Sequence, residues 1–388
     1  MELSQKAIHS VNNSKMAFCK FLSANDVGTT GTHQAGIYIT KNAISMLFDE
    51  PGKRGETLSR EIGIFWQEDF YTNSRFVYYG CGTRNEYRIT RFGRGFPFLQ
   101  PEHLGDLFVL VKVDYETYNA YVLSSEEEIN EFLDAYSLSP SDTGSIITRK
   151  SLEDNPQIKL EIDKYLNDVT EEFPSSILLS KAARHIYNKV YNYENEILIN
   201  PDNRLVSWLN LEYLIFKYLE ISRYSDALSA PFEDVDKFLE FANVVLNRRK
   251  SRAGKSLENH LRTVFSANDM NFEFQPTTEG YRKPDFLFPG DDAYRNISWP
   301  DNKLVFLGAK TTCKDRWRQI LSEAGKIKIK HLFTLQQGIS SRQLHEMEEE
   351  NVVLVVPKEY HNAYPKEYRD KIMSLKTFIE YTKEKTKY

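Results

Sequence analysis

The chain has 388 residues and a formal net charge of −5 at pH 7. This length exceeds that of one typical domain and suits two domains, each able to bury its own core. The weakly acidic balance argues against a generic nucleic-acid coat protein, which would carry a large positive charge.

Charge is distributed unevenly along the chain. Residues 121–180 contain thirteen Asp or Glu against four Lys or Arg, whereas residues 248–330 contain seventeen Lys or Arg against ten Asp or Glu. The later region therefore predicts a basic surface for a polyanion, and the acidic region could screen that surface or compete for it.

The three cysteines, Cys19, Cys81 and Cys313, are widely spaced and odd in number, which favours a reducing compartment over a disulfide framework. They form no motif for a metal cluster. The first fifteen residues lack an apolar core, and no run of eighteen apolar residues occurs. We therefore expect a cytoplasmic protein without a membrane partner.

The first 150 residues predict a mainly β domain. Glycines and turn residues separate short alternating runs such as "GIYIT", "DLFVLVKVDY" and "NAYVLSS". The apolar pattern then collapses into Ser, Pro, Asp and Gly over residues 137–159. We expect a first domain over residues 1–150, a linker over 151–160 and a second domain over 161–388.

The second domain is expected to begin with helices and to continue as an α/β unit. Apolar residues at spacings of three and four predict helices over 178–197, 208–224 and 235–250. Strands and helices alternate from residue 251 onward. Helices are expected over 256–267, 315–328 and 370–384, and strands over 283–288, 303–310, 331–335 and 351–357. This order predicts a mixed sheet flanked by helices.

Four residues of this unit have the chemistry of phosphodiester hydrolysis. Asp285 is expected at the start of one strand, Lys310 at the end of the next, Glu323 on the following helix and Glu258 on an earlier helix. Carboxylates supply the hard oxygen ligands that Mg²⁺ prefers, and a lysine can stabilise the attacking hydroxide and the developing charge. Spacing alone leaves a plain structural interpretation open, because Pro-Asp pairs are common in turns and lysines often end strands in solvent.

The expected helix over 315–328 has two faces. Trp317, Ile320, Leu321 and Ala324 form its apolar face, and the opposite face consists of Arg316, Gln319, Glu323 and Lys326. That polar face could meet the ends of the strands.

Longer strings resemble a known family. "PD" followed by "KTTCKDRWRQILSEA" resembles the active-site pattern of the restriction endonuclease superfamily, in the variant whose second acidic residue lies on the following helix. "NRRKSRAGKSLE", "RKPDFLFP", "HLFTLQ", "LSANDVGTTGTHQAGIYI" and "TRNEYRITRFGRG" resemble the EcoRII-like type IIE restriction endonucleases. The resemblance covers most of the chain. It implies an N-terminal, mainly β pseudobarrel (B3-like) domain that binds effector DNA and a C-terminal restriction-endonuclease-like α/β domain.

The resemblance implies roles for the residues of the second domain. Glu258, Asp285, Lys310 and Glu323 match the catalytic positions, with the three carboxylates placing Mg²⁺ and Lys310 beside the scissile phosphate. Lys314, Asp315 and Arg316 match a block that enters the major groove, where arginine can bind guanine and a carboxylate can accept from cytosine. Tyr294 matches a position near the active site, and we expect it to contact the target DNA.

The first domain is expected to bind a second copy of the site. If "TRNEYRIT" is a strand, Arg84, Glu86 and Arg88 lie on one face and are suited to base edges. Arg91 and Arg94 stand among glycines and are suited to phosphates. His33 and Tyr38 match effector-site positions, although a loop histidine and a half-buried strand tyrosine are the ordinary interpretations of the residues alone. Gly82 stands where the family is expected to have a lysine, which removes one phosphate contact.

The family resemblance implies a Mg²⁺-dependent homodimer that cuts double-stranded DNA at a sequence like CCWGG before the first C, leaving staggered 5′ ends. It also implies that the N-terminal domain shields the catalytic cleft until effector DNA binds, and that a companion cytosine-5 DNA methyltransferase protects the host. Two alternatives stay open, namely a non-catalytic DNA-binding regulator and a repair or nicking nuclease. An oxidoreductase is disfavoured because no glycine fingerprint follows a strand.

Overall fold

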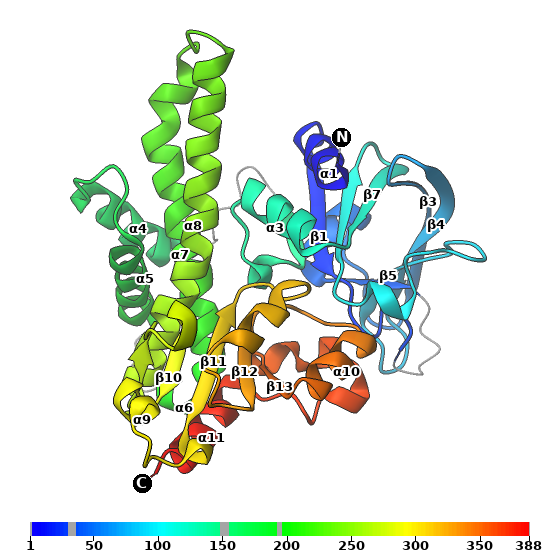
Figure 1. Cartoon of the computed structure of the whole chain (residues 1–388). Helices are drawn as coiled ribbons and strands as arrows, with labels where there is room; N and C mark the ends of the chain where they lie inside the picture. The colour runs from blue at the N-terminus through cyan, green and yellow to red at the C-terminus, as the bar shows by residue number, and fades with distance from the viewer. Residues whose placement is uncertain (1, 30–35, 148–154, 192–195, 388) are drawn as a thin grey trace.

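The computed structural model describes residues 2–29, 36–147, 155–191 and 196–387. An N-terminal β-rich domain and a C-terminal α/β domain both lie against a layer of helices (Figure 1). In the part of the chain that is described, no helix is both long and apolar enough to span a membrane.

The N-terminal domain is built on one eight-stranded sheet with the order β2-β5-β4-β3-β7-β6-β1-β8. Its strands are β1 Met16–Phe21, β2 Ile37–Ile39, β3 Thr57–Trp66, β4 Phe70–Tyr79, β5 Glu86–Thr90, β6 Leu107–Lys112, β7 Thr117–Leu123 and β8 Ser145–Ile147. All neighbouring pairs are antiparallel except β3 and β7. The mainly β prediction is confirmed.

The sheet curves so that its two edges approach each other. The Thr40 hydroxyl, which follows β2, donates a hydrogen bond to the Gly144 carbonyl, which precedes β8. Inside the curve lies an apolar core centred on the buried Trp66 and a group of phenylalanines. Helices α1 Leu3–Asn12 and α3 Glu126–Ala135 cover a second core on the other face of the sheet. This construction is the pseudobarrel expected from the sequence.

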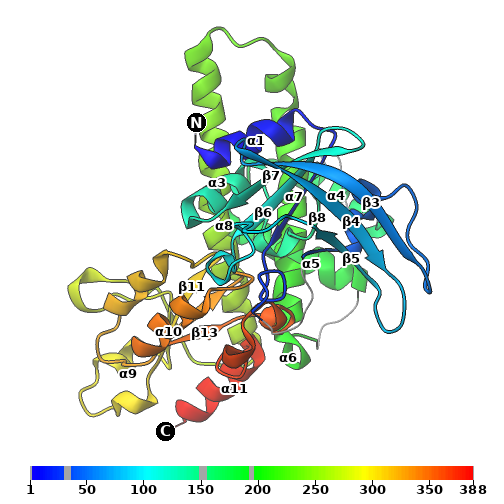
Figure 2. The same cartoon turned by 90° about the vertical axis from the view of Figure 1, so that its right-hand side faces the viewer.

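The helical layer contains α4 Pro156–Asp168, α5 Ser176–Tyr191, α6 Glu196–Ile199, α7 Pro201–Ser229 and α8 Val235–Ala267. The far ends of α7 and α8 form a hairpin that projects away from both domains (Figures 1 and 2). Residues 151–154 of the expected linker lie outside the described residues, and residues 156–160 already belong to α4.

Helix α8 is continuous, whereas the sequence predicted separate helices over 235–250 and 256–267. The two predicted ranges left residues 251–255 between the helices, but the 33-residue helix runs through this segment, including Gly254. Leu257, Leu261 and Val264 are buried as predicted. The continuous helix connects the projecting hairpin to the core of the C-terminal domain.

The C-terminal domain has a five-stranded mixed sheet with the order β13-β12-β11-β10-β9. Its strands are β9 Glu273–Phe274, β10 Phe286–Phe288, β11 Val305–Lys310, β12 Lys330–Thr334 and β13 Val352–Val355. Strands β11, β12 and β13 are parallel, and the pairs of β10 with β9 and with β11 are antiparallel. The C-terminal domain also contains the helices α9 Asp291–Arg295, α10 Ser341–Glu349 and α11 Leu375–Lys385. Helix α2 Ile44–Leu47, not yet named, belongs to the N-terminal domain. The prediction of a mixed sheet flanked by helices is confirmed.

Eight short 3₁₀ helices complete the described elements. They are η1 Lys41–Ala43, η2 Pro101–His103, η3 Pro140–Asp142, η4 Glu279–Tyr281, η5 Asp301–Lys303, η6 Arg316–Ser322, η7 Lys358–Ala363 and η8 Lys366–Tyr368.

The prediction of one α-helix over residues 315–328 is wrong. Only η6, Arg316–Ser322, forms there, and Glu323 already has an extended backbone. Ala324 then adopts a φ of 47°, a left-handed conformation that no α-helix continues through. Trp317, Ile320 and Ala324 are nevertheless buried as the apolar pattern predicted. The apolar pattern thus predicted which of these side chains are buried, but it did not predict the backbone conformation.

Candidate active site and DNA interface

Asp285 and Lys310 are held together by the antiparallel pair of β10 and β11. Asp285 directly precedes β10, and its carboxylate accepts a hydrogen bond of 2.7 Å from the backbone N–H of Ala309. Lys310 is the next residue and ends β11. The sequence prediction that two neighbouring strands deliver these side chains to one edge of the sheet therefore agrees with the structure.

Glu258 and Glu323 complete a group of four interacting charges. Burial, followed by the charge of Asp285, raises the pKa of Glu258 and of Glu323 to about 7 in each case, and the charge of Lys310 opposes both shifts. Burial also raises the pKa of Asp285, against the Ala309 hydrogen bond and Lys310. The four predicted catalytic side chains are therefore brought into mutual electrostatic reach, although they come from distant segments.

The chemistry of these three carboxylates suits a hard divalent cation. Burial raises all three pKa values, and the charge of Asp285 adds to the shifts of Glu258 and Glu323, so a bound cation would stabilise their ionised forms. Within the described residues, however, no three His, Cys, Asp or Glu side chains are arranged closely enough to hold a metal ion. The residue types fit Mg²⁺, whereas a finished coordination shell is not formed by these side chains alone.

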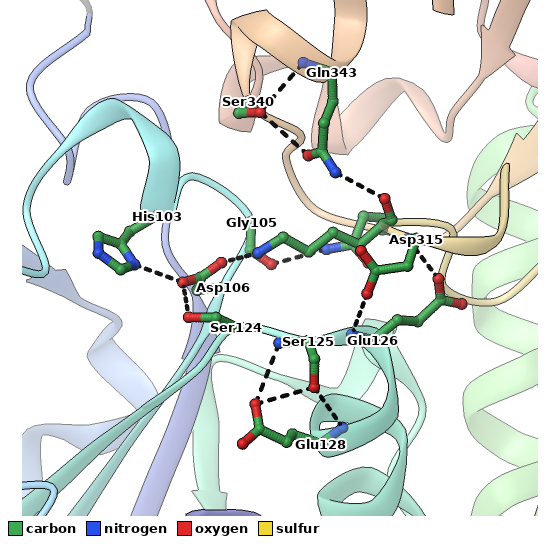
Figure 3. A network of polar contacts seen from close by, with 12 residues as sticks. His103, Gly105, Asp106, Ser124, Ser125, Glu126, Glu128, Asp315, Ser340 and Gln343 are labelled. Carbon is green, nitrogen blue, oxygen red and sulfur yellow. Dashed lines mark hydrogen bonds and ion pairs between the residues drawn. The ribbon is translucent and has the colours of Figure 1, made fainter. Parts of the chain in front are cut away.

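The three residues expected to enter the major groove are bound by the N-terminal domain. Figure 3 shows one of them, Asp315, beside Glu126. Lys314 is buried in an ion pair with Asp106, whose other carboxylate oxygen receives His103 Nδ1 at 2.7 Å. The carboxylate of Asp315 accepts from the backbone N–H of Glu126 at 2.8 Å. In this structure the groups that were expected to read bases instead contact protein.

Glu126 makes the densest set of contacts across the domain boundary. Its carboxylate accepts from the backbone N–H of Asp315 at 2.8 Å and of Arg316 at 2.9 Å. The Arg316 guanidinium donates to the same group, with Nε at 2.8 Å and Nη2 at 2.7 Å. Thr312 Oγ1 adds a contact of 3.1 Å. A carboxylate that accepts from a backbone loop and an arginine has the hydrogen-bonding character of a DNA phosphate or of a guanine edge.

Further contacts fix the boundary on both sides of Glu126. Arg249 of α8 donates to the carbonyls of Asp134 and Ala135 at the end of α3, at 3.2 and 2.7 Å. Gly105 and Gly338 approach so closely that a Cβ on Gly105 would lie 2.1 Å from the Gly338 carbonyl oxygen. The two domains are therefore in direct contact over several elements.

Tyr294 is buried and faces the protein. Its hydroxyl donates to the Glu279 carboxylate at 2.7 and 2.8 Å and accepts from the backbone N–H of Lys326 at 3.3 Å. The structure thus places Tyr294 beside the segment that carries Glu323. A direct contact with target DNA, as expected from the sequence, would require this side chain to be uncovered.

The effector-site residues on β5 agree only in part with the prediction. Glu86 and Arg88 lie on one face of the strand, where Arg88 Nη2 contacts Glu86 at 3.1 Å. Strand β5 begins at Glu86, so Arg84 precedes the strand. Only Glu86 and Arg88 of the three predicted residues therefore alternate along β5. The Arg88 side chain is only 2% exposed and also donates to the Gly36 carbonyl at 3.0 Å.

Other predicted effector residues surround β5. Tyr38 of β2 is paired in register with Arg88, and its burial raises the pKa of its hydroxyl. Arg84, Arg91 and Arg94 are exposed, and Arg91 contacts Glu61 at 2.7 Å. Gly82 has a φ of +64° and open space around it, so the turn itself favours glycine there. His33 lies outside the described residues.

Several functional candidates were missed in the sequence. Asp106 and Glu126 engage the predicted DNA-reading block, and Lys330, Glu279 and Arg282 contact the segment around Glu323. The only available signal was regional, since Glu126 belongs to the acidic stretch that was expected to compete for the basic surface. No local motif distinguishes Glu126 from its neighbours.

Comparison with known proteins identifies both halves of the chain. The family model described as "Restriction endonuclease EcoRII, N-terminal" matches residues 11–151, and the model "EcoRII C terminal" matches residues 216–379. The type II restriction enzyme EcoRII of Escherichia coli is 38% identical over 93% of this chain and 92% of its own length.

Solved structures give weaker similarities. Metal-depleted Ecl18kI in complex with uncleaved DNA matches at a TM-score of 0.45 and 19% identity, over 59% of this chain and 83% of that one. A complex of the restriction endonuclease PspGI with substrate DNA matches at 0.45 and 15%, over 55% and 93%. The B3 domain of the UbaLAI restriction endonuclease with cognate DNA matches at 0.26 and 21%, over 38% and 97%.

The full-length similarity and the two domain matches agree in order and in position with the β-rich and α/β domains described above. The chain belongs to the EcoRII family of type II restriction endonucleases.

Proposed function

We propose that this protein is a Mg²⁺-dependent type II deoxyribonuclease that cuts double-stranded DNA at a CCWGG-like sequence and is stimulated by a second, effector copy of that sequence. The observation that carries the proposal is the convergence of Glu258, Asp285, Lys310 and Glu323 at one edge of the mixed sheet. A non-catalytic DNA-binding regulator would have no need for three partly buried carboxylates around a lysine, because their burial costs stability.

The roles within the site follow from charge and position. Asp285, Glu258 and Glu323 would hold Mg²⁺, which when bound supplies charge neutralisation at the scissile phosphate and activation of a water nucleophile. Lys310 lies beside them and would stabilise negative charge on the attacking hydroxide and on the phosphate. The product would carry a 5′-phosphate. The hydrogen bond from the Ala309 backbone N–H fixes the orientation of the Asp285 carboxylate.

The contacts between the two domains support a restraint of the enzyme by its N-terminal domain in the absence of effector DNA. Glu126 and Asp106 occupy the hydrogen-bonding groups of the segment Lys314 to Arg316, so DNA and the N-terminal domain would compete for the same donors. Effector DNA bound by Tyr38, Arg84, Glu86, Arg88, Arg91 and Arg94, together with His33, would favour the separated domains. The exposed Arg84 and Arg94 could make the first contacts with phosphates.

A homodimer is proposed because a near-palindromic site presents two equivalent halves. Support comes from the projecting hairpin, where apolar residues at helical spacing are unusually exposed. We name Val235, Phe238, Leu239 and Leu246 of α8 the hairpin stripe; their exposed fractions are 71, 48, 50 and 45%. An apolar row of this length on a projecting helix suits burial against a second copy. The remaining proposals are a cytoplasmic location and a companion cytosine-5 DNA methyltransferase.

The proposal is tested by digesting unmethylated plasmids that carry one or several CCWGG sites, with Mg²⁺ or with EDTA, and sequencing the ends. We expect Mg²⁺-dependent cuts at CCWGG with 5′-phosphate overhangs, and faster cleavage of multi-site plasmids. The Lys310→Ala variant should bind the same DNA and fail to cut it. Binding without cleavage by the wild-type protein would leave a DNA-binding regulator, and cuts at unrelated sequences would leave a repair or nicking nuclease.

A further inference from the structure

The backbone around Glu323 forms a turn that is held from several directions. Because η6 ends at Ser322, Glu323 has no helix to orient it, and Ala324 adopts a left-handed conformation with a φ of 47°. Such a conformation is unfavourable for a residue with a Cβ and persists only where the surroundings enforce it. We name residues 322–326 the Glu323 turn.

Lys330 provides the innermost contacts of this turn. Its ammonium group donates to the carbonyl oxygens of Glu323 and Ala324, the latter at 2.7 Å. Lys330 opens β12, where it is paired in register with Phe306 of β11, and its side chain is almost completely buried. The lysine therefore connects the central strand pair of the domain directly to the backbone of the Glu323 turn.

A second group holds the outer side of the turn. The Glu279 carboxylate accepts from the backbone N–H of Gly325 at 3.4 Å and from the Tyr294 hydroxyl. The Tyr294 carbonyl accepts from Lys326 Nζ at 2.6 Å, and Arg282 donates to the Ser322 carbonyl. Every residue of the turn thus has a backbone or side-chain contact to a segment outside it.

A buried lysine is an expensive way to satisfy two carbonyl groups. The Lys330 side chain is buried, so its ammonium group loses most of its contact with water on folding. Residues that cost folding stability and contact an active-site segment are commonly kept for function. The hydrogen bond from Lys330 to Glu323 is to the backbone carbonyl, which fixes the position of the residue and leaves the carboxylate oxygens free of a hydrogen bond from Lys330.

We propose that Lys330 is a positioning residue for the cleavage reaction, which holds the Glu323 turn so that the Glu323 carboxylate stays beside Asp285 and Lys310. The inference rests on the proposed function, because it assigns to Glu323 a part in holding Mg²⁺. The inference explains how Glu323, which lies outside η6, can keep a defined position in the proposed active site.

The test compares Lys330→Met, Lys330→Arg and the wild-type chain. Single-turnover cleavage of a CCWGG duplex is measured over a range of Mg²⁺ concentrations, with effector duplex present. We expect Lys330→Met to cut about 10- to 100-fold more slowly and to need more Mg²⁺ for half-maximal rate, as is typical when a group supporting a metal ligand is lost. Lys330→Arg should recover part of both losses because it restores N–H donors. Lys376→Met replaces an exposed lysine on α11 and serves as the matched control.

The outcomes separate positioning from a purely structural role. A folded Lys330→Met protein with the wild-type rate and Mg²⁺ requirement overturns the inference, as does a slower protein with a lower melting temperature and an unchanged Mg²⁺ requirement. If Lys330→Met does not fold, Glu279→Ala tests the same turn from its outer side, and an unchanged Mg²⁺ requirement there overturns the inference. A wild-type chain that never cuts instead overturns the proposed function.

Discussion

Glu258 and Glu323 make the stability of the metal-free protein depend on pH. Burial and Asp285 raise the pKa of each from 4.5 to about 7. The folded state therefore binds more protons than the unfolded state between pH 4.5 and 7, and stability falls as pH rises through this window. Above pH 7 both groups are charged, and the unfavourable interactions are fully present.

Replacing Glu258 by Gln removes one of these charges. We expect Glu258→Gln to raise the melting temperature in EDTA at pH 8 by about 2–4 °C, since screening by water reduces the effect to on the order of 1 kcal/mol. The gain should disappear at pH 4.5, where the native carboxyl is protonated. Thermal unfolding at both pH values, with the exposed Glu384→Gln as the matched control, measures the difference. An equal shift at both pH values would contradict the assignment.

Sequence reasoning predicted the positions of the charged side chains at two neighbouring strand ends. Asp285 and Lys310 could be predicted because the edge of a buried strand limits where a following charge can lie. Lys330, Glu279 and Arg282 could not, because they act on backbone groups of the Glu323 turn and their spacing follows no period. Arg88 illustrates a third case, in which a residue suited to DNA is buried by its own strand neighbours.

Among the elements, α3 has the largest part in the contact between the domains. Its first residue, Glu126, follows an N-cap formed by Ser125 and points its carboxylate at the segment that contains Arg316 (Figure 3). The cap fixes the start of the helix and hence the position of Glu126. A short helix at the rim of the β domain thus contacts two of the three expected DNA-reading residues, Asp315 and Arg316.

Removal of the Glu126 carboxylate should relieve the proposed restraint of the enzyme by its N-terminal domain. We expect Glu126→Ala to raise cleavage in the absence of effector DNA by about 10-fold, because a lost charged hydrogen bond costs about 1.5–3 kcal/mol and 1.4 kcal/mol is one factor of ten. Initial rates on a single-site plasmid, with and without added effector duplex, measure this change. Glu127→Ala is the matched control, since Glu127 is the next residue and is exposed. An unchanged basal rate for Glu126→Ala would exclude competition at this contact.

Element boundaries were predicted well where burial alone decides them and poorly where the backbone changes conformation. The strands β10 to β13 agree with the apolar runs, because buried strands show themselves as short apolar segments. Residues 315–328 fail because the same apolar spacing suits a 3₁₀ turn followed by a left-handed Ala324. Helix α8 was predicted as two helices with residues 251–255 between them, although a glycine such as Gly254 inside a long helix costs only about 1 kcal/mol.

For the whole molecule, the hairpin stripe predicts the assembly state. A dimer that buries Phe238 should lose affinity by about 30-fold on Phe238→Glu, because loss of an aromatic anchor costs about 2 kcal/mol. Sedimentation velocity over a concentration series would show the shift toward monomers. Val244→Glu adds the same charge to an exposed apolar residue on the opposite face of α8 and should leave the dimer intact. If the two variants had the same dimer affinity, the hairpin stripe would not be part of the dimer interface.

The sequence predicted that an acidic and a basic region could meet, but not which residues form the contact between the domains. Glu126 and Arg316 are 190 residues apart, and no rule of local periodicity connects them. The opposed charges of residues 121–180 and 248–330 indicated attraction, but which acid meets which base depends on how the curved sheet docks against α8. Tertiary docking, rather than propensity or pattern, determines that pairing.

Helix α8 carries both the hairpin stripe and Glu258 without interruption. In a dimer joined through the stripe, each proposed catalytic centre would thus be connected through one continuous helix to the contact with the partner subunit. Sliding the two helices past each other by one helical turn would move the centres by ~5.4 Å, which exceeds the ~3.4 Å rise of one base pair. If the protein cuts DNA to staggered ends as proposed, the length of the single-stranded overhang would then depend on how the two hairpins pack.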